Sequence, residues 1–131
     1  MQSDVTVPAV STKALWTGRV ISGLLVLFLL FDSVVKFFPI PPVVEAFQRL
    51  GYSPSLATWL GATLLTCTIL YVIPRTSVLG AILLTAYLGG ATATHVRADD
   101  PFLFPVVFGV LAWLGLYLRD VRLRVLVPVR G

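Results

Sequence analysis

The sequence is poor in the residues that most metalloproteins and redox enzymes rely on, with one cysteine and one histidine among its 131 residues. Cys67 has no second cysteine with which to form an intrachain disulfide, and no Cys-x-x-Cys or Cys/His pattern of metal ligands is present. The chain also has no phosphate-binding loop, nucleophile elbow or haem-ligand pair. We therefore expect no metal site and none of these familiar catalytic devices.

Charged residues are scarce as well, at 12% of the chain, whereas 57% of the residues are hydrophobic. A soluble domain usually carries about twice that charged fraction. The net charge is +4, but the basic residues lie at the ends of apolar runs instead of along one stripe, so we expect no nucleic-acid partner. This composition predicts a single-domain integral membrane protein whose main partner is the lipid bilayer.

Four apolar segments are long enough to cross a bilayer, which takes roughly 20 residues. We place these spans at about residues 14–37, 55–73, 76–96 and 102–118. Ser53 and Pro54 predict the start of the second span, because serine caps helices and proline suits their first turn. No small-x-small cleavage site follows the first span, so we expect it to be retained. The predicted fold is all-α: a polar tail over residues 1–13, then an integral membrane four-helix bundle over 14–131.

A short amphipathic segment separates the first two spans. Val43, Phe47 and Leu50 recur at helical spacing, while the polar residues of the segment fall on other faces. Pro42 suits a helix start and Gly51 suits the position just past a helix end. The segment therefore predicts a short helix that lies in the membrane interface.

The basic residues are divided unequally between the two ends of the predicted spans. Of the ten, three lie at the end that we call outer (Lys36, Arg49 and Arg97), and the other seven lie at the inner end with both termini. The positive-inside rule then predicts a multi-pass protein with both termini in the cytoplasm. Small residues should line the contacts between spans, namely Gly18, Ser22, Ala57, Gly61, Ala81, Thr85, Gly89, Gly109 and Gly115.

Asp32 and Lys36 are the first candidates for a functional site. They are four residues apart near the outer end of the first span, so they share a helix face. Ionisable residues inside a span are costly and usually face the protein interior, which makes Asp32 a candidate base or anchor and Lys36 a candidate ligand-binding residue. The simpler alternative is a self-satisfied ion pair, with Lys36 reaching up to water.

His95 is the second candidate, at the outer end of the third span. A histidine with a carboxylate partner is an acid–base pair, so we predict Asp32 and His95 as catalytic residues. The alternative is an interfacial histidine bonded to a loop. Other polar side chains near the outer end are predicted to bind a ligand, and these are Lys36, Glu45, Tyr87, Thr92 and Arg97.

Several runs of residues together resemble a known family. They are Phe31-Asp32 with Lys36, the turn Tyr71–Thr76, the third-span run Leu84–Ala91 with Ala93–Arg97, and the last-span run Gly115–Asp120 with Arg122–Arg124. On these residues the chain resembles the DoxX-like family of small bacterial membrane proteins over residues 13–130. The resemblance implies a four-helix protein of the bacterial inner membrane, with Asp32, Lys36, His95 and Arg97 at the matching positions.

The resemblance also ranks the functional hypotheses. The wider family takes its name from the membrane subunit of a thiosulfate:quinone oxidoreductase, which implies a quinone- or redox-linked subunit that binds a lipophilic small molecule and works with a redox partner protein. A second hypothesis is a membrane-embedded acid–base enzyme, of isomerase or epoxide-hydrolase type, acting on a lipophilic substrate. A third is a non-catalytic partner or small transporter, which would need a homo-oligomer to form a pathway.

Overall fold

The computed structural model describes residues 10–126 as an all-α chain without a strand in that range. The helices are α1 (Thr12–Val35), α2 (Pro41–Arg49), α3 (Leu56–Val72), α4 (Ser77–Arg97), α5 (Leu103–Arg119) and α6 (Val121–Leu126). Most of the predicted polar tail and the last five residues lie outside the described part. The four long helices match the four predicted spans to within two residues at each end.

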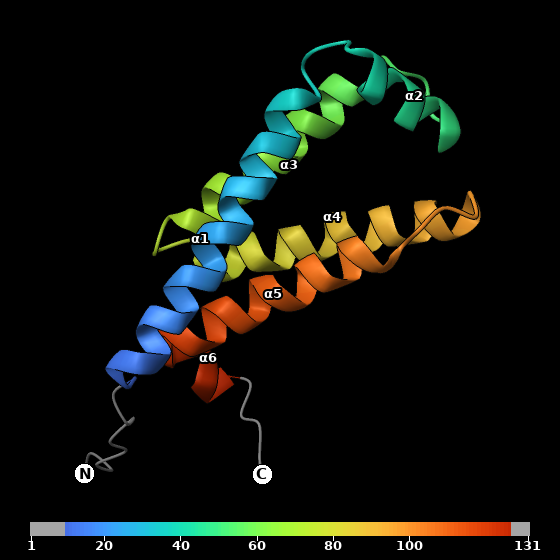
Figure 1. Ribbon diagram of the computed structural model, residues 1–131. Coiled ribbons are helices and arrows are strands. Elements are labelled where there is room, and N and C mark those ends of the chain that lie inside the picture. The colour runs from blue at the N-terminus through green and yellow to red at the C-terminus, as the bar shows by residue number, and fades with distance from the viewer. Residues whose placement is uncertain (1–9, 127–131) are drawn as a thin grey trace.

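The four long helices form two arms that meet at one end and diverge toward the other (Figure 1). One arm holds α1 and α3 and the other holds α4 and α5, with further contacts between α1 and α5 and between α3 and α4. The closed end carries the α3–α4 turn and α6. At the open end, α2 extends from the first arm toward the tip of α4 (Figure 1).

The N-termini of α1 and α3 are formed in different ways. Ser11 caps α1, since its hydroxyl accepts a hydrogen bond of 3.1 Å from the backbone N–H of Ala14. The predicted cap at Ser53 is wrong, because α3 begins at Leu56 with Ser55 at its N-cap. Backbone bonds from Leu56 to the Ser53 carbonyl and from Ala57 to the Pro54 carbonyl form a tight turn first, and this turn delays the helix.

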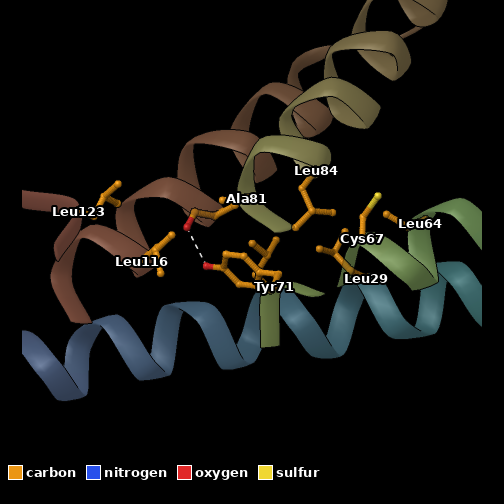
Figure 2. Close-up of a cluster of buried hydrophobic side chains, with 10 residues drawn as sticks. Leu29, Leu64, Cys67, Tyr71, Ala81, Leu84, Leu116 and Leu123 are labelled. Carbon is orange, nitrogen blue, oxygen red and sulfur yellow. Dashed lines mark hydrogen bonds between the residues drawn. The ribbon is translucent and has the colours of Figure 1, made fainter. Parts of the chain in front are cut away.

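The core lies near the closed end, where all four long helices contribute to it. Its buried side chains are Leu25, Leu29, Leu64, Cys67, Tyr71, Ala81, Leu84, Ala112, Leu116 and Leu123. Tyr71 is fully buried at the centre of this cluster (Figure 2), and the dashed line there marks its hydroxyl bonded to the Ala112 carbonyl at 2.7 Å. One buried tyrosine therefore joins α3 to α5 by a hydrogen bond as well as by packing.

Small residues bring the helix backbones close together at particular points. Gly18 of α1 and Gly115 of α5 lie against each other, because a Cβ built on Gly18 would come within 2.7 Å of the Gly115 carbonyl oxygen. Gly61 and Ala57 are buried as predicted. Thr85 of α4 contacts α5, because its hydroxyl oxygen accepts a hydrogen bond of 2.6 Å from Trp113 Nε1. The prediction for Gly89 is wrong, since a Cβ there meets nothing within 4 Å; Gly80 makes the close approach of α4 instead, against the Tyr71 backbone.

The predicted short helix between the first two spans is α2. It buries Val43 and Phe47 against Ala57 of α3 and leaves its charged residues exposed. Gly51 follows it with a φ of 81°, a conformation that glycine adopts without strain. The N–H groups of Gly51 and Tyr52 then bond the carbonyls of Gln48 and Phe47, which is the Schellman motif that ends many helices.

The outward faces of the long helices are strongly apolar. Leu24, Leu27 and Phe31 of α1 are each about two-thirds exposed, and Trp59 of α3 and Val110 of α5 are exposed to a similar extent. By length and composition, α1 and α4 could each cross a membrane; α3 and α5 are apolar too but have 17 residues each. A water-soluble monomer rarely exposes so much contiguous apolar surface.

Candidate functional site

A cavity of about 570 Å³ lies between the diverging arms at the α2 end. Its walls are mostly apolar side chains and backbone from every helix but α6, including Leu29, Leu64, Ala91 and Phe108. Polar side chains line it too, and they are Asp32, Lys36, Arg49, Tyr52, Tyr87, Thr94, His95 and Asp100. This volume falls in the ordinary range for small-molecule sites, and the mixture of wide apolar walls with a few polar groups is typical of them.

Asp32 and Lys36 form an ion pair on one wall of the cavity. The Lys36 Nζ lies 2.6 Å from the Asp32 Oδ2, as expected for residues one helical turn apart. The Lys36 side chain is 14% exposed and that of Asp32 is 39% exposed, so the carboxylate is the more accessible partner. The pair neutralises its own charge, which lowers the cost of placing either group in apolar surroundings.

His95 lies on the opposite wall, in the last turn of α4. Its Nδ1 is 2.7 Å from the Ala91 carbonyl oxygen, and a carbonyl only accepts, so Nδ1 carries a proton. The Nε2 faces the Asp100 Oδ2 at 3.5 Å, and the ring meets the edge of Phe104 at a centroid distance of 4.8 Å. Nε2 is therefore the ring atom through which His95 can exchange a proton with Asp100 or with a ligand.

The loop after α4 places Asp100 beside the histidine. Asp99 adopts a φ of 54°, which folds the chain back on itself. The N–H of Asp100 bonds the His95 carbonyl at 2.8 Å and the N–H of Asp99 bonds the Val96 carbonyl at 3.1 Å, so α4 ends in a second Schellman motif. This turn places the Asp100 carboxylate beside the imidazole ring of His95, which is five residues earlier in the chain.

Polar contacts tie the α2 end to the α4 end across the mouth of the cavity. Arg49 Nε lies 2.9 Å from Asp100 Oδ1, and Arg97 Nη2 donates to the Leu50 carbonyl at 2.8 Å. The Tyr52 hydroxyl lies 2.9 Å from Thr94 Oγ1. Since the Thr94 hydroxyl itself donates to the Gly90 carbonyl, Tyr52 must be the donor in that bond.

The predicted site residues fall into two groups. Asp32, Lys36, Tyr87 and His95 line the cavity, although Asp32 and His95 are not bonded to each other: each has its own partner among the described residues.

The other three predicted residues lie outside the cavity. Glu45 is exposed on α2, and Arg97 lies beyond the cavity wall, with its guanidinium 5.9 Å from the centre of the Tyr52 ring. Thr92 lines a separate, almost wholly apolar groove between α4 and α5, and its hydroxyl bonds the Leu88 carbonyl.

Four further polar residues line the cavity and were not predicted from the sequence, namely Arg49, Tyr52, Thr94 and Asp100. Asp100 could not be predicted because nothing in the sequence announces a left-handed residue at Asp99; glycine is the usual signal there. Across residues 10–126, no three His, Cys, Asp or Glu side chains gather as metal ligands would.

Comparison with known proteins adds one positive finding. The model of the DoxX-like family matches residues 20–115, which is well over half of the chain. The chain belongs to the DoxX-like family. Family membership, together with the two helices long enough to span, indicates a membrane protein. Neither a search of curated proteins nor a search of solved structures returned a significant match. The match ends before the arginines of α6 and includes every polar residue that lines the cavity.

Proposed function

We propose that this DoxX-like protein is a four-span protein of the bacterial inner membrane whose cavity binds a lipophilic small molecule with a polar head group. The cavity itself supports this most directly: apolar walls surround a small number of polar groups on two facing sides. The apolar outer faces of the long helices suit lipid contact. The excess of basic residues at the closed end suits a cytoplasmic location for that end and for both termini.

The polar groups favour a head group that accepts hydrogen bonds. Lys36 offers an ammonium group, and the Tyr87 hydroxyl has no hydrogen-bond partner among the described residues. A quinone head fits this pattern, since its carbonyl oxygens are acceptors on a flat apolar ring. Asp32 and the Nε2 of His95 are then the groups placed to hold or deliver protons. A redox partner protein would supply or remove the electrons, because the sequence has no pattern of metal or haem ligands of its own.

The test is to identify the lipophilic molecules that copurify with the protein in mild detergent, by mass spectrometry. We expect a defined lipophile, such as a quinone, to be enriched over bulk lipid in the wild type and lost in Asp32→Asn. Asp120→Asn is the matched control, because it makes the same change in a carboxylate that also pairs with a basic residue, but at the closed end. Bulk phospholipid alone in all three samples would contradict the proposal and favour a scaffold role.

A further inference from the structure

A chain of hydrogen bonds crosses the closed end of the molecule, far from the cavity. The Arg119 Nε donates to Ser22 Oγ at 3.1 Å, and Ser22 Oγ lies 3.0 Å from the Tyr71 hydroxyl. Tyr71 gives its only hydroxyl proton to the Ala112 carbonyl, so the Ser22 proton must point to Tyr71. Every donor direction is therefore fixed, from the guanidinium of α5 through α1 and α3 and back to α5.

This chain holds the Arg119 side chain in one position. The guanidinium carbon also lies 5.3 Å from the centre of the Tyr71 ring, so a fully buried aromatic supports the charge from one side. Ser22 and Tyr71 are themselves buried, and neither can move without breaking bonds in the core. An arginine anchored through Nε and its ring contact presents its two Nη groups in a defined direction, with little entropy left to lose on binding.

The Nη groups of Arg119 have no hydrogen-bond partner among residues 10–126, and the residue is partly exposed. The neighbouring arginines differ in this respect. Arg122 is bonded to both oxygens of Asp120 and to the Pro74 carbonyl, and Arg124 is bonded to the Tyr117 and Leu118 carbonyls. Arg119 is thus a half-buried, anchored cation whose Nη groups form no ion pair with a described acid, and such a charge is stabilised by an anion from outside the chain.

We propose that Arg119 binds the phosphate of an anionic phospholipid at the inner face of the membrane. A guanidinium fork matches the spacing of two phosphate oxygens and makes two charge-assisted hydrogen bonds to them. Lys13, Arg19 and Arg75 lie at the same end of the long helices and add positive potential around it. The inference rests on the membrane placement proposed above, but not on the cavity or on any ligand in it.

The experiment measures binding of phosphatidylglycerol, against phosphatidylcholine, to the detergent-solubilised full chain by native mass spectrometry. We expect the wild type to prefer phosphatidylglycerol and Arg119→Gln to lose about tenfold in affinity for it, as for removal of a charge-assisted contact. Arg122→Gln is the matched control: it removes the same charge three residues away, from a guanidinium already engaged by Asp120, and should keep the wild-type preference. An equal loss in both variants would show diffuse attraction only and overturn the proposal.

Two further variants keep the positive charge at residue 119 and so distinguish a loss of lipid binding from a loss of the fold. Ser22→Ala keeps the charge of Arg119 but removes the oxygen that orients it, so we expect a smaller loss than in Arg119→Gln. Arg119→Lys keeps the charge without the fork and should bind phosphatidylglycerol less well than wild type; full binding by this variant would refute the role of the fork. Displacement of the lipid by millimolar inorganic phosphate would identify a soluble ligand instead. If the wild-type protein is found in the aqueous fraction, the membrane placement is refuted. If it is embedded in the membrane but does not prefer phosphatidylglycerol, only the proposed Arg119 site is refuted.

Discussion

Gly115→Ala tests the close contact between α1 and α5. A methyl group at this position would collide with Ser22 Oγ and come within 3.2 Å of the Ser22 nitrogen and 3.3 Å of the Gly18 carbonyl oxygen. Two of these three atoms belong to backbone, so the collision can be relieved only by rotating Ser22 away or by moving α1 from α5. Rotating Ser22 breaks its bonds to Tyr71 and Arg119.

The expected cost follows from three contributions. Overpacking costs about 1–3 kcal/mol. Losing two interhelical hydrogen bonds costs roughly 0.6 kcal/mol each in a membrane protein. Alanine recovers about 1 kcal/mol through its higher helix propensity. We therefore expect the free energy of unfolding to fall by about 1–3 kcal/mol.

The assay is reversible unfolding by SDS titration in mixed micelles, followed by far-ultraviolet circular dichroism. Gly89→Ala is the matched control, because Gly89 is also in a helix but a Cβ there meets nothing within 4 Å. We expect that variant to be unchanged or slightly more stable, since alanine favours the helix. If the two variants unfold alike, the Gly18–Gly115 contact and the Ser22 chain built on it are not as described.

Two further perturbations probe the open and closed ends. Asp100→Asn removes the carboxylate that faces both Arg49 and His95, so we expect faster hydrogen exchange at residues 47–52, with a stability loss below about 1 kcal/mol because Arg49 is largely exposed. Asp99→Asn, which keeps a residue type tolerant of positive φ, should leave exchange there unchanged. At the closed end, the hydrogen bond from Arg122 holds the pKa of the Asp120 carboxyl below its ordinary value of 3.8. That stabilisation is present above about pH 3.8 and is lost as pH falls through the lower folded-state value, so Asp120→Asn should be less stable at neutral pH and converge with wild type in acid; parallel pH profiles would contradict this.

Hydrophobic length and turn residues were enough to predict the helices. The four spans were placed to within two residues because the length of an apolar run depends only on local sequence. Gly51 ends α2 as predicted, since a glycine at that position is a strong local signal. The start of α3 was misplaced because a tight turn used the same Ser-Pro pair in another way.

The faces of the helices were harder to predict than the helices themselves. Thr92 and His95 are three residues apart, which leaves them roughly 60° apart around the helix axis. That angle is enough to place Thr92 in the outer groove while His95 lines the cavity. None of the long helices has a pronounced polar face, so composition does not show which small residues face a neighbour. This is why Gly89 was expected in a contact that Gly80 makes instead.

Only some of the residues that line the cavity were predicted, for a related reason. Asp32 and Lys36 could be paired from their spacing alone, and the ion pair is present. Asp100, Arg49 and Tyr52 reach the cavity through two Schellman turns and through contacts between residues more than 40 positions apart. Such contacts depend on how the arms are arranged in space, which no local pattern encodes.

The most direct test of a ligand in the cavity compares two adjacent glycines. Gly90 lines the cavity and Gly89 lines the groove on the other side of α4, and a Cβ on either meets nothing within 4 Å. The measurement is the amount of copurifying lipophile per protein, by mass spectrometry, in Gly90→Trp and Gly89→Trp. We predict that Gly90→Trp loses most of the lipophile, because the indole occupies the cavity, while Gly89→Trp retains it. Equal retention in both variants would contradict binding in this cavity.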